Sequence, residues 1–118
     1  MKPLTKAEEM VMKVLWKKQT GLLMEIVELM PAPKPHKNTV ATILKILVEK
    51  GFVDIENLGR VHRYFPIVSK EEYSNAALSG MAQGYFNGSY TDIVSFLVDE
   101  KKLSIKELEL LLKELKKK

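Results

Sequence analysis

Apolar residues recur at three- and four-residue spacing in three segments of the N-terminal half, from about residue 5 to 18, 22 to 30 and 38 to 50. This spacing places the apolar side chains of each segment on one face of a helix. We therefore expect three amphipathic helices whose apolar faces meet in one core. The positions expected to be buried are Ala7, Met10, Val11, Val14, Leu15, Trp16, Leu23, Ile26, Val27, Met30, Val40, Leu44, Leu47 and Val48.

The residues that flank these segments predict where the helices begin and end. Thr5 and Glu8 have the spacing of a capping box, in which each side chain bonds a backbone N–H of the other residue. Gly21 suits a left-handed position after the first helix, and Asn38 is a good N-cap for the third. The prolines of segment 31–35 prevent regular structure, so we expect a stiff, exposed loop there.

Two short segments after the third helix alternate between apolar and polar residues, as half-buried strands do. They comprise residues 52–56 and 61–65, and Asn57-Leu58-Gly59-Arg60 between them has the composition of a turn. Pro66 ends the second strand because it has no backbone N–H. Three helices followed by a hairpin is the order of a winged helix, which is a variant of the helix-turn-helix. The fold class is therefore mainly α-helical with a small β-hairpin.

The rest of the chain predicts a helical arm with more apolar side chains than it can bury alone. Capping residues at Ser69, Thr91-Asp92 and Ser104 begin three further helices. Along the first of these we expect Tyr73, Ala76, Ala77, Leu78 and Met81 to be buried.

Because little else could cover the leucines of this arm, we expect a homodimer. The predicted domains are a winged-helix DNA-binding domain, residues 1–68, and a helical dimerisation domain, residues 69–118. The residues expected at the dimer interface are Tyr73, Ile93, Phe96, Leu97, Leu108, Leu111, Leu112 and Leu115.

The net charge of +4 lies entirely in the N-terminal part of the chain. Residues 1–68 contain 11 Lys and Arg against 7 Asp and Glu, whereas residues 69–118 contain 8 of each. A basic part joined to a neutral, leucine-rich part indicates that one part meets phosphate and the other meets protein. An ordinary solvated surface with uneven charge is the alternative.

Composition excludes several classes of protein. The 118 residues include no cysteine, which excludes a disulfide scaffold, a thiolate nucleophile and a cysteine metal site. There is no run of about eighteen apolar residues, so we expect no membrane insertion. The acidic pair Glu8-Glu9 stands where a signal peptide would have apolar residues, so we expect a cytoplasmic protein.

The third helix of a winged helix enters the major groove, so its outward polar residues are candidate contacts to bases and phosphates. Arg60 at the tip of the hairpin can reach a phosphate or the minor groove. His62 and Arg63 point to opposite faces of their strand, so only one of them can easily face DNA. Taken singly, such residues are often ordinary surface positions. The candidate DNA contacts are Lys37, Asn38, Thr39, Thr42, Lys45, Arg60, His62 and Arg63.

Several short motifs stand in the same order as in the BlaI/MecI penicillinase-repressor family, which the chain therefore resembles. The match is dense over residues 4–73 and looser over the C-terminal helices. The motifs are Leu4-Thr5-Lys6-Ala7-Glu8, Val11-Met12-Lys13-Val14-Leu15-Trp16, Glu25-Ile26-Val27, Thr39-Val40-Ala41-Thr42, Leu47-Val48-Glu49-Lys50-Gly51-Phe52, and Gly59-Arg60 to Tyr64-Phe65-Pro66.

The resemblance implies a dimeric transcriptional repressor that binds an inverted-repeat operator and dimerises through its C-terminal helices. It also implies that a membrane-bound sensor metalloprotease relieves repression by cutting near the C-terminal arm. By position, it makes Thr39 and Thr42 the recognition-helix contacts, Lys37 and Asn38 their phosphate neighbours, and Arg60 the wing contact.

The chain departs from the family pattern at named positions. Many relatives have an arginine in place of Ile46, and the loss of that cation would shift the operator sequence or weaken phosphate contact. Relatives often have a tyrosine in place of His62. Members that respond to β-lactams are cut at an Asn-Phe bond, where this chain has Phe96-Leu97. The related copper-responsive repressors end in cysteine pairs, a chemistry that a chain without cysteine lacks.

Three other functions compete with repression. A winged helix can act as a protein-interaction adaptor, because fold does not determine function. With His36 and His62 as the only histidines and no catalytic motif, we expect neither an enzyme nor a metal site nor a cofactor. A directly ligand-sensing regulator would need a pocket, for which the candidate lining is Tyr73, Met81, Tyr85, Phe86 and Phe96.

Overall fold

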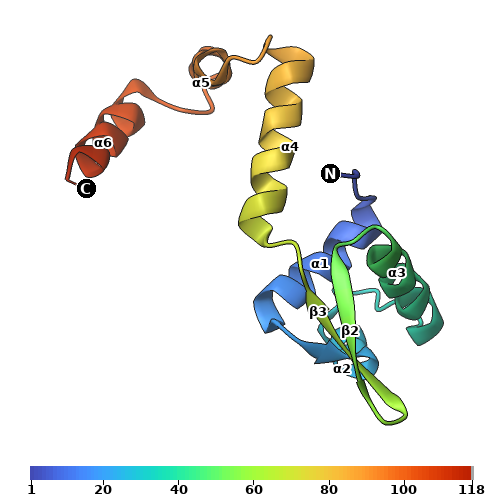
Figure 1. Ribbon diagram of the computed structural model, residues 1–118. Helices are drawn as coiled ribbons and strands as arrows, with labels where there is room; N and C mark the ends of the chain where they lie inside the picture. The colour runs from blue at the N-terminus through green and yellow to red at the C-terminus, as the bar shows by residue number, and fades with distance from the viewer. Residues whose placement is uncertain (118) are drawn as a thin grey trace. The chain divides into compact units, whose positions relative to one another are not determined.

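The computed structural model describes residues 1–117, and the chain forms two compact units, Met1–Ser74 and a second unit that begins at Asn75. The division falls inside a helix, later than the boundary at residue 68 that the sequence predicts. The elements are α1 (Lys6–Lys18), β1 (Gly21–Leu22), α2 (Leu23–Leu29), α3 (Lys37–Glu49), β2 (Val53–Leu58), β3 (Val61–Pro66), α4 (Lys70–Tyr85), α5 (Tyr90–Asp99) and α6 (Ile105–Lys116) (Figure 1).

The first unit is a winged helix, as the sequence predicts. Its three helices precede the hairpin β2–β3, which pairs in antiparallel register from Val53 opposite Pro66 to Leu58 opposite Val61 (Figure 1). The turn is shorter than predicted, because Asn57 and Leu58 are paired in β2.

A third strand, β1, was not predicted from the sequence. Gly21 pairs with Tyr64, so the sheet order is β1-β3-β2. The prediction that Gly21 is the left-handed cap of α1 is wrong, since Gln19 takes positive φ (76°) there. Gly21 is required for space instead: a Cβ at this position would lie 3.0 Å from Cγ1 of Ile26.

The core of the first unit joins all three helices to the start of the hairpin. Its buried residues are Val11, Met12, Leu15, Ile26, Val27, Met30, Val40, Leu44, Leu47, Phe52 and Val53. Most of these were expected, but the prediction for Ala7 is wrong: Ala7 is exposed, whereas Glu8 and Met12 are buried. On this buried face of α1 the Glu8 carboxylate pairs with Lys50, with 2.6 Å between Oε1 and Nζ.

The second unit is helical and has little core of its own. The rings of Phe86 and Phe96 meet edge to face with 5.7 Å between their centroids, and Ala82 is buried. Neither α5 nor α6 contains a buried residue. The prediction that Ala77, Leu78 and Met81 are inside is wrong for the single chain, in which Ala77 is exposed and Leu78 and Met81 are nearly half exposed.

Capping sequences explain where most helices begin. Thr5 with Glu8 and Ser104 with Glu107 form complete capping boxes, and Ser69 with Glu72 makes the same pair of bonds. The predicted start of α5 at Thr91-Asp92 is wrong, because the helix begins at Tyr90. Ser89 is its N-cap and accepts from the N–H of Asp92. Such side-chain bonds satisfy N–H groups that the helix itself leaves unpaired.

Candidate nucleic-acid interface

The α3 helix is anchored by one face and exposes the other. Val40, Leu44 and Leu47 recur at helical spacing and are fully buried. Because this face is fixed in a packed core, the opposite face is presented in one orientation, as base readout requires. The predicted contacts on α3 are all exposed, and they are Lys37, Asn38, Thr39, Thr42 and Lys45.

His36, rather than the predicted Asn38, caps the N-terminus of α3. The Nδ1 atom of His36 accepts a hydrogen bond from the N–H of Asn38 at 3.0 Å, and the helix begins at Lys37. The prediction for Asn38 is therefore wrong. Because the His36 side chain makes the cap, the side-chain amide of Asn38 is not needed for it. Asn38 is exposed on the surface.

The wing ends in a two-residue turn that exposes an arginine. Gly59 has φ +69°, which suits the first residue of a tight hairpin turn, and Arg60 follows it. Leu58 and Val61 beside the turn are 42% and 46% exposed. The wing tip therefore offers one cation between two apolar side chains.

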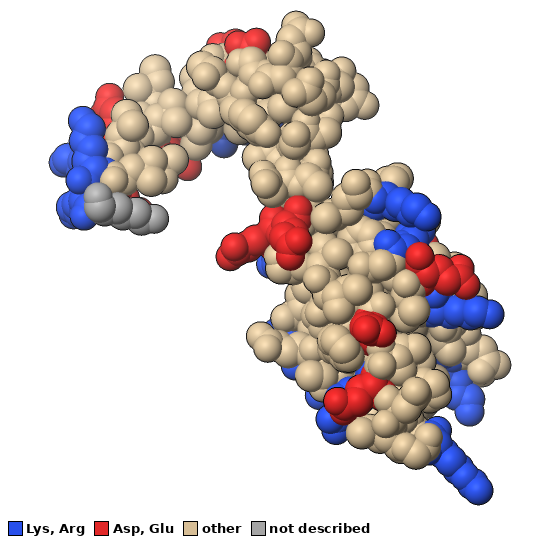
Figure 2. All heavy atoms as spheres, viewed as in Figure 1, with Lys and Arg blue, Asp and Glu red and all other residues tan. Residues whose placement is uncertain are grey.

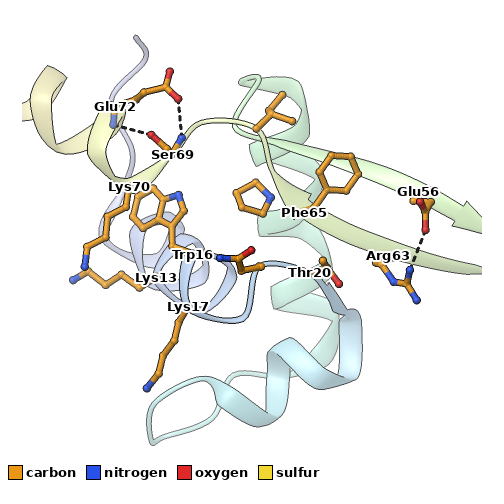
Figure 3. Close-up of a pocket in the computed structure, with 13 residues that line it drawn as sticks. Lys13, Trp16, Lys17, Thr20, Glu56, Arg63, Phe65, Ser69, Lys70 and Glu72 are labelled. Atoms are coloured by element: carbon orange, nitrogen blue, oxygen red, sulfur yellow. Dashed lines mark hydrogen bonds and ion pairs between the residues drawn. The ribbon is translucent and has the colours of Figure 1, made fainter.

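His62 and Arg63 have different surroundings on β3. The His62 ring stacks on Tyr64 with 6.4 Å between centroids. Arg63 donates from Nη1 to Oε1 of Glu56 at 3.1 Å and lines a hollow formed by α1, β3 and the start of α4 (Figure 3). Arg63 thus has a carboxylate partner on the neighbouring strand. The hollow is also lined by Lys13, Trp16, Lys17, Gln19, Thr20, Phe65, Pro66, Ile67, Ser69, Lys70 and Glu72.

Positive side chains gather along one edge of the winged-helix unit. Figure 2 shows Lys and Arg side chains on the edge where α3 lies in Figure 1 and at the end of the hairpin, while acidic side chains lie over the middle of the hairpin. The exposed cations on α3 and the hairpin are Lys37, Lys45, Arg60 and Arg63, of which Arg63 is paired with Glu56. This charge attracts the phosphates that flank a groove.

A partly buried ion pair ties the C-terminal end of α3 to α1. Besides Glu8, the Lys50 ammonium donates to the carbonyl of Pro3 at 3.1 Å. Burial alone would raise the pKa of Glu8, but hydrogen bonds from Lys50 and from the N–H of Thr5 outweigh it and hold this pKa below its usual value. Glu8 is therefore a carboxylate at neutral pH, and it holds Lys50 in place.

Tyr73 joins the first turn of α4 to the winged-helix unit. Its hydroxyl donates to Oε2 of Glu9 at 2.6 Å, and its ring packs against Trp16 and Phe52 at centroid distances of 5.7 and 5.8 Å. Burial and the Glu9 carboxylate raise the pKa of Tyr73 to about 12. The structure thus places Tyr73 in the first unit, apart from the other predicted dimer residues.

The other predicted dimer residues lie on α5 and α6. Ile93, Leu97 and Leu108 are half-buried. The remaining four are between 45% and 54% exposed, and they are Phe96, Leu111, Leu112 and Leu115. On α6, four leucines share one helical face and form an apolar stripe without a cover in the described part of the unit: Leu108, Leu111, Leu112 and Leu115.

Comparison with known proteins identifies the family. A sequence model described as "Penicillinase repressor" matches residues 4–117. The chain belongs to the penicillinase repressor family. This repressor is 29% identical over 103 residues to the penicillinase repressor of Bacillus licheniformis, covering 86% of this chain and 80% of the relative. It is 25% identical over 107 residues to the methicillin resistance regulatory protein MecI of Staphylococcus aureus strain N315, covering 90% and 87%.

A solved structure of a relative supports the fold of the first unit. The repressor is similar to the solution structure of the DNA binding domain of the repressor BlaI, with a TM-score of 0.53 and 32% identity. The similarity covers 62% of this chain and 94% of that domain. The chain is therefore a transcriptional repressor with a winged-helix DNA-binding domain, and its family is not a class of enzymes.

Two features are absent from residues 1–117, the part of the chain that the structure describes. None of the helices described there has both the length and the apolar character needed to cross a membrane. In the same range, no three His, Asp or Glu side chains are grouped so that they could hold a metal ion.

Sequence reasoning missed three residues that support the interface of this repressor. His36 follows a proline, and its role as a cap has no strong sequence signal. Glu8 was identified for its cap but not for the ion pair with Lys50, which is distant in sequence. The bond between Tyr73 and Glu9 also spans most of the first unit. Long-range pairs of this kind have no local pattern that could reveal them.

Proposed function

We propose that this repressor acts in the cytoplasm as a homodimer that binds an inverted-repeat operator with one winged helix on each half-site. In a symmetric dimer the two recognition helices lie about 34 Å apart, which is one turn of DNA. The proposed contacts are Lys37, Asn38, Thr39, Thr42 and Lys45 in the major groove and Arg60 and His62 on the wing.

The observation that carries this proposal is the division of α3 into a buried face and an exposed polar face. Val40, Leu44 and Leu47 keep the helix from rolling, so its short polar side chains stay at fixed positions. Phosphate contacts from Lys37 and Lys45 would set the register of the helix, while the residues between them meet base edges.

We propose that the two arginines of the wing contribute unequally to operator affinity. Arg60 lies at the exposed turn, whereas Arg63 is paired with Glu56 and lines the hollow beside α1. A guanidinium that already has a carboxylate partner gains less from a phosphate. Arg63 therefore contributes less to operator affinity than Arg60 in this proposal.

The apolar stripe of α6 supports the homodimer. Burying one leucine side chain contributes about 1.5–3 kcal/mol, and the stripe offers several in each subunit. A second copy of the same stripe covers it symmetrically, as two-fold interfaces require. We assign Tyr73 to the joint with α4 rather than to this interface, because its ring and hydroxyl have partners in the first unit.

Titration of labelled operator DNA tests the proposal. Inverted repeats are first selected from random DNA, and the selected site and a scrambled site are then titrated at several salt concentrations. We expect Thr42→Ala to reduce the preference for the selected site, whereas Arg60→Ala should weaken binding to both DNAs. Equal binding to every DNA at every salt concentration contradicts the proposal. Loss of DNA binding with an intact dimer favours the adaptor function.

We also propose that cleavage in α5, near Phe96-Leu97, by a membrane-bound sensor metalloprotease relieves repression. Phe96 is 45% exposed and α5 has no buried residue, so local opening of this helix costs little. Mass spectrometry of the repressor from induced cells should find a fragment that ends in α5. Induction with only full-length repressor present contradicts this mechanism.

A further inference from the structure

The exposed face of α3 has two edges of different chemistry. Thr39, Thr42 and Ile46 follow one another at spacings of three and four residues and share one edge. Lys45 lies next to Thr42 on the other side of this face, about 100° around the helix from Ile46. We call the three residues the methyl stripe, because each carries a methyl group on its side chain. A helix with these two edges can place cations against phosphates while its methyl groups meet base edges.

Thr42 presents its methyl group because its hydroxyl is occupied. The Oγ1 atom donates to the carbonyl oxygen of Asn38 at 3.0 Å, one turn earlier in the same helix. This bond holds the hydroxyl against the helix, so the other substituent of Cβ points away from that carbonyl. Toward a partner, Thr42 therefore offers a methyl group and an acceptor lone pair, rather than a donor.

Ile46 has no role in the core that would explain an apolar residue there. Ile43 and Val48, its partly buried neighbours, pack against the core cluster, whereas Ile46 is partly buried without packing against that cluster. Its branched side chain continues the edge that begins at Thr39 and Thr42. An isolated apolar surface residue needs no explanation, but here three methyl-bearing residues are contiguous.

The composition of α3 narrows what this face can recognise. Guanine is most often read by arginine or lysine. The described helix from Lys37 to Glu49 contains no arginine, and its two lysines, Lys37 and Lys45, are proposed to contact phosphates. Thymine differs from the other bases by a C5-methyl group in the major groove, which is read by apolar contact. The Thr42 acceptor also suits the exocyclic amine of adenine or cytosine.

We propose that the methyl stripe of Thr39, Thr42 and Ile46 reads thymine methyl groups, so that each half-site has T·A pairs beneath it. This inference rests on the proposed binding of α3 in the major groove. Ile46 is then a specificity residue in direct contact with DNA. Contact with one thymine methyl removes about one methyl group from water and strengthens binding about fourfold.

The test uses the full-length repressor and its selected operator. Each thymine of one half-site is replaced in turn by deoxyuridine, which removes the C5-methyl group and keeps the Watson–Crick pairing. We expect about fourfold weaker binding at one or more thymines in the centre of the half-site. Replacements outside the half-site serve as the control and should leave the affinity unchanged.

Variants assign the contact to a residue. Ile46→Ala should abolish the difference between thymine and deoxyuridine at one position while leaving it elsewhere. Thr42→Val keeps the methyl group and should retain the difference between thymine and deoxyuridine at its own position. Thr42→Ser removes the methyl group and should abolish that difference. Lys45→Gln should weaken binding to both DNAs equally. Circular dichroism checks that each variant is folded, as exposure of these positions predicts.

The outcomes separate this inference from the proposed function. Selective operator binding with no effect of deoxyuridine at any position overturns the methyl readout and leaves the proposed function intact. A deoxyuridine effect that Ile46→Ala and Thr42→Ser both leave unchanged also overturns it. Failure to select any operator overturns the proposed function itself.

Discussion

At the scale of single residues, the ion pair between Glu8 and Lys50 links two helices that are far apart in the sequence. Glu8 is 5% exposed, and its carboxylate is bonded both to Lys50 and to the cap of α1. Removing one member of such a pair leaves the other charge poorly solvated. The pair therefore stabilises the position of α3 as well as the start of α1.

Replacing Lys50 with methionine should destabilise the protein by about 1–3 kcal/mol, because the Glu8 carboxylate loses its strongest partner. The pKa of Glu8 is lowered by folding, so its contribution to stability is present above its usual pKa of 4.5 and is lost as pH falls through the lowered value. Urea denaturation at pH 7 and below pH 4 measures both effects. Equal loss of stability at the two pH values would contradict this account.

At the same scale, Tyr73→Phe tests the joint between α1 and α4. The substitution keeps the ring contacts with Trp16 and Phe52 but removes the hydroxyl that donates to Glu9. We expect a loss of about 1–2 kcal/mol in the free energy of unfolding, as for a hydrogen bond to a charged group. Tyr73→Ala should cost more, because it also leaves a cavity. Thermal denaturation of the three proteins gives the order.

At the scale of secondary-structure elements, the wing and α3 carry different kinds of contact. The turn at Gly59-Arg60 exposes a cation, whereas Arg63 lies on the strand and pairs with Glu56. A phosphate contact contributes through the release of counterions and therefore depends on salt. The two arginines can be told apart by this dependence.

Arg60→Ala should reduce the slope of log affinity against log salt by about one for each subunit, since it removes one phosphate contact. Arg63→Ala should change the slope less, because Glu56 already neutralises that guanidinium. Anisotropy titrations between low and moderate salt measure the slopes. An equal reduction in both variants would show that the Arg63–Glu56 pair opens on DNA.

Most elements of this fold could be predicted from the sequence, because helical spacing and capping residues are local signals. The capping boxes at Thr5 and Ser104 and the alternation in the hairpin placed their elements correctly. The strand β1 could not be predicted, since two residues are too short for a pattern and depend on β3 for their bonds. In the candidate site, the exposed residues of α3 could be predicted from helical spacing. The bond that turns the Thr42 hydroxyl toward the Asn38 carbonyl could not.

At the scale of the whole molecule, the second unit has an apolar surface that the proposed homodimer would cover. The helices α5 and α6 have no buried residue, and the apolar side of α6 shows leucines about half exposed. The proposed dimer would bury this surface and would also join two DNA-binding units. Linked units bind two half-sites more tightly than one unit binds one, because the second contact is intramolecular.

Replacing Leu111 and Leu112 together with aspartate should give a monomer at micromolar concentration, because charges on the apolar stripe oppose its burial. Affinity for the full operator should fall at least tenfold, whereas affinity for a single half-site should stay the same. Sedimentation and titration measure the two effects. Lys106→Asp, which adds the same residue on the other side of α6, is the control. A dimer that survives the double substitution would place the interface elsewhere.

The single tryptophan of the chain gives the molecule an internal fluorescent reporter. Trp16 donates from Nε1 to the carbonyl of Val68 at 2.9 Å, and its ring packs against Tyr73. Its emission therefore comes from one site, at the junction where the wing passes into α4. Detachment of that turn would expose the indole to water and shift its emission to longer wavelength. Operator binding or cleavage of the arm can thus be examined for its effect on this junction without attaching a dye.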